Sequence, residues 1–584
     1  MRNHKTAFPR ITQLLGLLGL LALAASWITP NKTYPWLSAW NEATAALGLL
    51  LLALTTLGRR AHARPALNLP LIALALLGLA GAWWQWSYGL LLWAGDAWLI
   101  TLSLGLFALS LPIGFTLVRE EDEGARWQDA LLCTMLAAGL VSAGLVLMQW
   151  LWASPYAVFV QEYSGDNRPY ANLGQPNHAN TLFFLALCCA LQLQRGRVIG
   201  RTGTLLAAAL LTLAMAVTQS RTGILQLVLL ALWSLWLARS GPEHRTWRWG
   251  LLALALCALW WLAMPWLSDA LHLPTRARDV GVEITGSDAR LAVWRGFFDA
   301  ALQRPWVGWG WLQSGAAQEQ FAACHPGIGV FFSYPHLLPL DLAVWLGFPL
   351  ALVLCALLAW WLWPHLRARG AATGGYWTAA VLGFLVHAML EYPQAYLYFL
   401  LPIGLMMGVI DARHPVHRTL RLPLAALRAL WAALALLAAL TLWDVVRASN
   451  AYTDIRFENA RIGLQRQKVE IPRLLLLDHL EGFLHLSAVD LSRPPTDAQL
   501  ASIHQTAQRF PFILSLLRQA WLLQAAGQGA ESARVQQLYC DIYGAKHCSQ
   551  GARQWHDWQQ RYPQLQTPDF LGQVLPPRCQ KSSF

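Results

Sequence analysis

Apolar runs close to 20 residues long recur between residues 11 and 443, and they constrain the fold more than any other feature of this chain. About 20 residues are needed for a helix to cross the hydrocarbon core of a bilayer. The runs are rich in Leu and Ala and do not alternate between apolar and polar residues, so they favour helices over strands. Only 13% of the residues are charged, whereas about a quarter is usual in a soluble domain. The sequence therefore predicts an all-α polytopic membrane protein.

We expect about thirteen transmembrane helices by this length criterion. Their predicted extents are residues 11–29, 41–57, 67–84, 97–118, 130–152, 178–194, 204–217, 223–238, 249–267, 338–363, 376–390, 395–411 and 424–443.

The positions of these runs divide the chain into four parts. Residues 1–267 form an N-terminal bundle of transmembrane helices, and residues 268–337 form a long loop. Residues 338–446 return to the membrane, and residues 447–584 form a polar tail. Apolar residues recur in the tail with helical spacing between Pro breaks, so we expect a small α-helical domain there.

Lys and Arg residues are unevenly distributed between the two sides of the predicted membrane. With a cytoplasmic N-terminus, the segments on the cytoplasmic side hold 19 Lys and Arg residues, whereas the short outer loops hold only Lys32, Arg168 and Arg221. Cytoplasmic loops are the ones that carry an excess of Lys and Arg. The long loop and the tail are therefore expected on the outer side. The net charge of +12 reflects this bias, and no basic cluster indicates nucleic acid.

Cys and Trp residues support the same organisation. Cys540 and Cys548 lie on the outer side and are close enough to close a small loop, although spacing alone does not assign the pairing. No spacing of Cys and His indicates zinc, and we expect no metal or other cofactor. Most of the 32 Trp residues are typical of an interfacial aromatic belt. Trp309 and Trp311 in the long loop are candidates for stacking on sugar rings instead.

Two short outer segments concentrate polar side chains where apolar runs begin. The segment NLGQPNHAN (172–180) includes Gln175, Asn177 and His178, which are more polar groups than a helix cap requires. The segment TQSRTG (218–223) contains Arg221. This Arg has two interpretations, namely snorkelling to the membrane interface or presenting a planar guanidinium group to phosphate oxygens.

The long loop contains GSDARLAVWRGF (286–297), which predicts an amphipathic helix. We expect one apolar face, made by Leu291, Trp294, Phe297 and Phe298. Arg290 falls in the first turn, where the helix dipole disfavours a cation. It is either a solvated surface Arg or a binding residue for an anion.

Two further outer segments carry ionisable groups. His336 lies in SYPHLLPLD (333–341), just before an apolar run, and a His can accept a proton near neutral pH. Glu391 and Tyr392 place a carboxylate and a phenol in the outer turn EYPQ. Polar groups at a membrane are hypotheses for function by default.

The segments NLGQPNHAN, TQSRTG, GSDARLAVWRGF, SYPHLLPLDLAVWLGFP and HAMLEYPQAYLYFLLP together resemble the bacterial O-oligosaccharyltransferases of the PglL type. These enzymes belong to the superfamily of O-antigen ligases and polymerases. The resemblance implies a multi-pass protein of the bacterial inner membrane, with the tail in the periplasm. It also implies en bloc transfer of a glycan from undecaprenyl diphosphate to Ser or Thr of a periplasmic acceptor such as a type IV pilin, without a metal.

The resemblance also implies roles for individual residues. The essential loop His of the family corresponds to His336, and the diphosphate-binding arginines of the ligases correspond to Arg221 and Arg290. The chain departs from the family around the loop His, because Leu337 and Tyr334 occupy positions where the family commonly has Asn and often has a second His.

The remaining candidates correspond to substrate-binding motifs of the family. The amide-rich motif matches Gln175, with Asn177 and His178 beside it, and the Glu-Tyr-Pro turn matches Glu391 and Tyr392. These residues are expected to position the sugar or the acceptor.

Three alternatives use different partners or chemistry. An O-antigen ligase would pass the glycan to lipid A–core sugar, and an O-antigen polymerase would pass one lipid-linked chain to another. A transporter would need charged or broken helices near the middle of the membrane. The ionisable residues collect at the outer ends of the runs instead, which favours the transferase.

Overall fold

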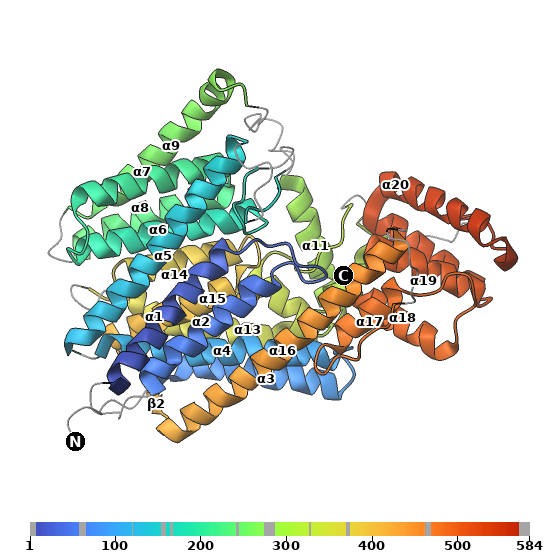
Figure 1. Cartoon of the computed structure of the whole chain (residues 1–584), viewed down its shortest axis with the longest axis horizontal. Coiled ribbons are helices and arrows are strands. Elements are labelled where there is room, and N and C mark those ends of the chain that lie inside the picture. Colours follow the sequence, from blue (N-terminus) through green and yellow to red (C-terminus); the bar gives the residue numbers. More distant parts are fainter. Residues whose placement is uncertain are drawn as a thin grey trace. The chain divides into compact units, whose positions relative to one another are not determined.

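The computed structural model describes the chain except for residues 1–6, 58–65, 120, 153–158, 164–167, 241–244, 274–286, 326–328, 370–373, 461, 463–468 and 572–584. Long α-helices dominate the described residues (Figure 1). The helices before the long loop are α1 (Ala7–Ile28), α2 (Ala39–Leu57), α3 (Leu69–Ser87), α4 (Ala94–Arg119), α5 (Glu121–Trp150), α6 (Pro176–Arg195), α7 (Arg201–Val217), α8 (Arg221–Ser240) and α9 (Trp247–Ala270). The helices that follow are α11 (Ser287–Gln303), α12 (Ser314–Phe321), α13 (Leu338–Arg367), α14 (Tyr376–Ala388), α15 (Leu397–Arg413), α16 (Leu424–Asn459), α17 (Asp478–Ser487), α18 (Asp497–Arg509), α19 (Ile513–Ala525) and α20 (Gly529–Arg561).

Each of the thirteen predicted apolar runs coincides with one of these helices. Among the described residues, eight helices are long and apolar enough to cross a membrane, and α2, α7 and α14 contain shorter apolar helices. The protein is therefore an all-α polytopic membrane protein in its main architecture. The exact number of crossings stays a prediction.

One small sheet departs from the predicted all-helical fold. Strands β1 (Ala66–Asn68) and β2 (Thr419–Arg421) pair antiparallel, with Ala66 opposite Arg421. Strands of three residues are too short to give a periodic pattern in the sequence. The side chain of Asn68 donates to the carboxylate of Asp411 over 3.2 Å and ties this sheet to the end of α15.

The chain falls into two compact units. Unit 1 comprises residues 1–77, 102–279 and 356–442, and unit 2 comprises residues 78–101, 280–355 and 443–584. Within unit 1, α6 and α15 are buried along almost their whole length. α6 packs against α5, α7, α8 and α14, so it is the central helix of this unit.

Unit 2 joins the long loop and the tail around one hydrophobic core. Trp521 of α19 and Trp555 of α20 are fully buried with their rings 5.0 Å apart, and Ala322 at the end of α12 packs into the same cluster. The predicted helical tail is confirmed as helical. The disulfide between Cys540 and Cys548 closes the loop that the sequence allowed.

A buried ion pair anchors the tail within unit 2. Arg509 donates from Nε and Nη2 to the two carboxylate oxygens of Asp96, each over 2.9 Å. Asp96 is fully buried and also accepts from Gln313 over 3.0 Å. Removing one partner of such a pair leaves an uncompensated buried charge, which costs about 3–5 kcal/mol.

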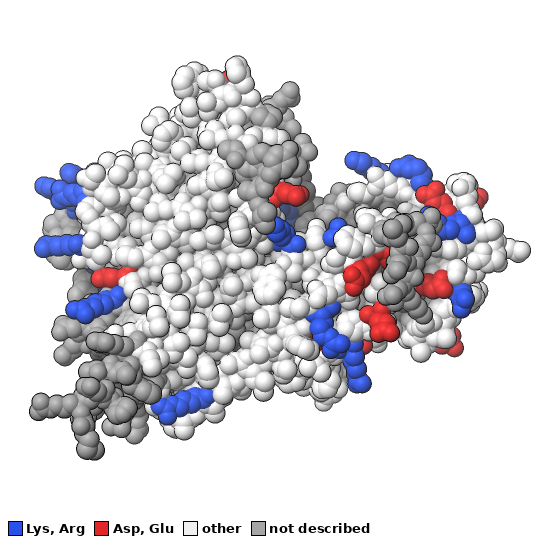
Figure 2. Space-filling model, in the orientation of Figure 1, with Lys and Arg blue, Asp and Glu red and all other residues white. Residues whose placement is uncertain are grey.

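Charged side chains are sparse on the face of the first helices shown in Figure 2, and they are more frequent over the C-terminal helices. This pattern fits a helical part that contacts lipid and a tail that contacts water.

Candidate functional site

The amide-rich segment forms the first turns of the central helix α6 in unit 1. Gln175 occupies the N-cap position with an extended backbone but makes no side-chain capping bond, and Pro176 follows at the first helical position. Asn177, His178 and Asn180 lie inside the helix and are buried. Capping is therefore not their role, and their side chains reach across to other helices.

Asn177 connects two segments that are far apart in the sequence. Its Nδ2 donates to Oε1 of Glu391 over 3.1 Å, and its Oδ1 accepts from the hydroxyl of Ser220 over 2.7 Å. Glu391 is 4% exposed, so this carboxylate is almost fully removed from water. The three side chains fix the beginning of α6, the turn before α15 and the loop before α8 relative to one another.

A second set of polar side chains continues this network one turn further along α6. Nδ2 of Asn180 donates to Gln226 of α8 over 2.9 Å, and Nε2 of Gln226 donates to the hydroxyl of Thr181 over 3.0 Å. That hydroxyl lies 2.8 Å from Nδ1 of His387 at the end of α14. Thr181, Gln226 and His387 were not predicted, although polar residues within apolar runs are a signal that could have identified them.

Aromatic rings surround His178 at the same end of the unit. Its ring centroid lies 4.7 Å from that of Tyr396, 6.4 Å from that of Tyr392 and 6.5 Å from that of Tyr398. Nδ1 of His178 is also 3.4 Å from the hydroxyl of Tyr398. The structure thus brings the predicted residues Asn177, His178, Glu391 and Tyr392 together, with Gln175 one turn away on α6.

The motif SRTG has a clear structural explanation at the start of α8. The hydroxyl of Ser220 accepts the N–H of Gly223 over 3.3 Å and caps the helix. Arg221 is exposed, whereas Thr222 is buried. A Cβ at position 223 would collide with the side chain of Asn180, so only Gly allows this close approach. The motif therefore directs one guanidinium group outward from a tightly packed turn.

Arg168 is a second cation at this loop, and it was not among the predicted site residues. Its Nη1 donates to the carbonyl of Gln219 over 2.9 Å. Gln219 has a positive φ of 49°, a conformation that costs a non-Gly residue free energy. The signal for Arg168 was its rarity, since it is one of the few basic residues in the short outer loops.

Tyr170 lies beside Arg168 and is neutral at ordinary pH. Burial raises the pKa of its phenol, and the nearby Glu162 raises it further. Its hydroxyl donates to the carbonyl of Glu162 over 2.6 Å. Tyr170 is thus a hydrogen-bonding group of this loop and not an acid.

His336 belongs to unit 2 and is held by its own segment. Its backbone has a positive φ of 68°, and its Nδ1 lies 2.7 Å from the carbonyl of Tyr334. A carbonyl only accepts, so Nδ1 carries the proton in the neutral ring and Nε2 keeps its lone pair. The backbone of Tyr334 therefore orients the imidazole, at a position where the family often has a second His.

Arg290 also belongs to unit 2, in the first turn of α11. Its side chain is half-buried. The helix predicted for 286–297 is confirmed as α11.

Trp309 is buried beneath the guanidinium group of Arg304, whose central carbon lies 4.1 Å from the ring centroid of Trp309. Stacking of Trp309 on a sugar was therefore a wrong prediction, and Trp311 already stacks on Trp345 with centroids 6.3 Å apart.

The candidate residues thus divide between the two units. Unit 1 holds Arg221 and the network around Asn177, and unit 2 holds Arg290 and His336. Their convergence on one diphosphate stays a prediction.

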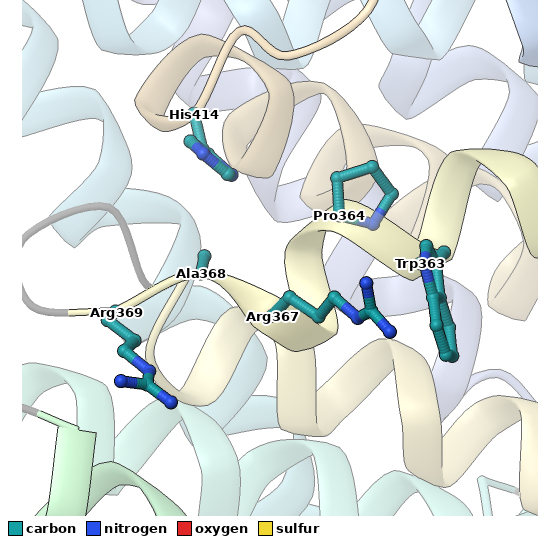
Figure 3. A pocket seen from close by; sticks show the side chains of 6 residues that line it. All are labelled: Trp363, Pro364, Arg367, Ala368, Arg369 and His414. Carbon is teal, nitrogen blue, oxygen red and sulfur yellow. The ribbon is translucent and has the colours of Figure 1, made fainter.

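One open pocket of about 580 Å³ lies elsewhere in unit 1 and contains basic side chains (Figure 3). Arg367, Arg369 and His414 line it together with Trp363, Pro364 and Ala368. His414 follows the last turn of α15, whereas Tyr396 precedes its first turn. A helix of this length separates the pocket from the network by about 25 Å. The pocket is therefore not part of the candidate site.

Within the described part of the chain, no group of three His, Cys, Asp or Glu side chains is arranged to hold a metal ion.

Comparisons with known proteins agree with the motifs in this site. Residues 206–355 match the family described as O-Antigen ligase, and residues 375–556 match the family described as Virulence factor membrane-bound polymerase, C-terminal. The chain is 28% identical over 552 residues to the General O-oligosaccharyltransferase of Acinetobacter baylyi, which covers 90% of this chain and 92% of that protein. It is 27% identical over 259 residues to the ComP-specific O-oligosaccharyltransferase of the same organism, which covers 44% and 46% respectively. No solved structure matches the chain. The resemblance seen in the sequence motifs is thus confirmed: the chain is similar along nearly its whole length to an O-oligosaccharyltransferase, and residues 206–355 match the O-antigen ligase family.

Proposed function

We propose that the protein is an O-linked protein glycosyltransferase of the bacterial inner membrane. It moves a glycan en bloc from undecaprenyl diphosphate to Ser or Thr of a periplasmic acceptor such as a type IV pilin. The observation that carries this proposal is the similarity to the General O-oligosaccharyltransferase along nearly the whole chain. The N-terminus is cytoplasmic, and the long loop and the tail are periplasmic, in agreement with the distribution of Lys and Arg.

The proposed reaction is a single displacement at the anomeric carbon. The acceptor oxygen forms a bond to that carbon while the bond from the carbon to the diphosphate oxygen breaks. Arg221 and Arg290 stabilise the negative charge that develops on the leaving diphosphate. The geometry of Arg221 supports this role, since its guanidinium group is exposed at a rigid helix start.

His336 takes the proton of the acceptor hydroxyl in this mechanism. The bond from Nδ1 to the carbonyl of Tyr334 leaves Nε2 as the proton acceptor. The proton then passes from the imidazole to water. Gln175 and Tyr392 position the sugar or the acceptor, and the network around Asn177 holds their segments in place.

An O-antigen ligase is the second candidate, because the family described as O-Antigen ligase matches residues 206–355. It would use the same donor site with a sugar of lipid A–core as the acceptor. A test of both uses the purified protein, an undecaprenyl-linked glycan, and either a pilin peptide or lipid A–core. Glycosylated peptide supports the proposal, and product with lipid A–core alone would replace it.

A further inference from the structure

Helix α11 of unit 2 has two apolar faces instead of the single face that the sequence predicted. Phe297 is fully buried, and its ring lies 4.9 Å from that of Phe321 in α12. Leu291 and Phe298 were expected on the same face, but both are exposed. The inner face is therefore already covered by protein, and a second face remains outside.

The outer face forms one continuous stripe. Leu291, Phe298 and Leu302 are 43%, 47% and 52% exposed. Successive residues of a helix are about 100° apart, which places these three side chains within about 40° of one another. Arg295 is exposed on the same stripe. An apolar stripe with a long basic side chain in it is typical of a helix that lies in a membrane interface, where Arg reaches the headgroups.

A break in α13 shows where a membrane boundary lies relative to α11. Gly347 has non-helical angles, with φ of 78°, and interrupts this 30-residue helix. The segment 305–310, which follows α11, forms backbone hydrogen bonds with α13 at this break. The N–H groups of Trp309 and Gly310 donate to the carbonyls of Val344 and Trp345, respectively. The N–H of Phe348 donates to the carbonyl of Pro305. A Cβ at Gly347 would collide with the backbone of Trp306.

The part of α13 after the break is just long enough to cross a membrane. It covers residues 348–367, which is about the 20 residues that a crossing requires. Gly347 therefore lies near one boundary of the hydrocarbon core. Trp306, which packs its backbone on Gly347, is 77% exposed at this level, and Trp is enriched at such boundaries.

The stripe is also continuous with the apolar surface of the crossing helix. The ring of Phe298 lies 6.1 Å from that of Phe348, and Leu352 one turn further along α13 is 66% exposed. An exposed Leu on a membrane-spanning helix faces acyl chains.

We propose that α11 is an interfacial helix whose stripe of Leu291, Phe298 and Leu302, together with Trp306, is immersed in the bilayer. The partner is the phospholipid bilayer itself, with acyl chains against the stripe and anionic headgroups at Arg295. The backbone hydrogen bonds at the break near Gly347 hold the end of α11 near the boundary of the hydrocarbon core. The lipid contact is present without any glycan donor, so the inference does not depend on the proposed function.

The test uses the full-length protein in nanodiscs of phosphatidylethanolamine and phosphatidylglycerol without donor. A fluorescent amino acid is incorporated by codon suppression at position 302, and in separate samples at positions 306 and 514. Leu514 of α19 is the matched control, because it is a helical Leu of the same unit and is 50% exposed. Quenching is measured with a phospholipid that carries a nitroxide near the headgroup, and with iodide in solution.

We expect the lipid nitroxide to quench positions 302 and 306 about threefold or more strongly than position 514, with iodide showing the opposite order. Equal lipid quenching at all three positions, or stronger iodide quenching at 302 and 306, would overturn the inference. If the substitution at 302 prevents folding, position 306 decides alone.

Discussion

The loop of Arg221 in unit 1 and the loop of His336 in unit 2 hold their key side chains in opposite ways. The first is fixed by side chains from distant parts of the chain, since Asn177 bonds to both Ser220 and Glu391. The second is fixed locally, by a left-handed backbone at His336 and by the carbonyl of Tyr334. In the proposed mechanism, the Arg that binds the diphosphate is thus placed by long-range packing, whereas the His that accepts the proton is placed by its own turn.

This difference predicts which substitutions affect the position of a distant side chain. Changes in the buried network should displace Arg221 because the network holds the loop before α8. Changes to side chains beside His336 should have little effect as long as the turn survives, because a backbone carbonyl is present whatever the side chain.

The largest effect is expected for His336→Ala. Removing the proton acceptor should lower kcat for glycan transfer by roughly 10²–10⁴, while the protein still inserts and folds. Transfer to a pilin peptide and thermal unfolding are measured on the same preparation. A variant that is folded and fully active would remove His336 from the mechanism.

A smaller loss is expected for Arg221→Lys. A point charge does not replace a planar fork that binds two phosphate oxygens, so transfer should fall by about 10². Arg239→Lys is the matched control, because Arg239 is exposed at the other end of α8. Equal activity of the two variants would mean that Arg221 only supplies positive charge.

The membrane helices could be predicted from the sequence because long apolar runs give a strong signal, and the tail could be predicted as helical from the spacing of its apolar residues. The break at Gly347 was not predicted, because the apolar run over 338–363 continues through it, although Gly347 and Pro349 are residues that interrupt helices. The hydrogen bonds of Thr181 with Gln226 and His387 were also missed, because these partners lie on helices far from α6 in the sequence. A pattern along the chain identifies polar residues at loop ends, but it does not pair them across helices.

The network itself is tested by Asn177→Ala, Ser220→Ala and the double variant. Each single change leaves a buried partner without its hydrogen bond, which costs about 1–3 kcal/mol of stability. We expect transfer to fall about tenfold in each, and less than additively in the double variant because both act on one loop.

Thr212→Ala serves as the control for lost stability. The buried hydroxyl of Thr212 donates to the carbonyl of Ala208 within α7, so its removal affects a single helix. Transfer by this variant should stay near that of the unchanged protein at a temperature where both are folded. A similar loss in all four variants would mean that the network stabilises unit 1 without positioning Arg221.

The smallest effect is expected for Tyr334→Phe. The carbonyl that orients His336 remains, and the ring still packs near Trp345, 5.3 Å away between centroids. Transfer should change by less than about twofold, because the backbone carbonyl and not the phenol orients His336. The same change at Tyr392, whose ring lies among those around His178, removes a phenol proposed to position the substrate and should raise KM severalfold. Each substitution removes one phenol hydroxyl. A tenfold loss of transfer in Tyr334→Phe with no loss in Tyr392→Phe would mean that the Tyr334 phenol takes part in the reaction, and that the backbone alone does not support His336.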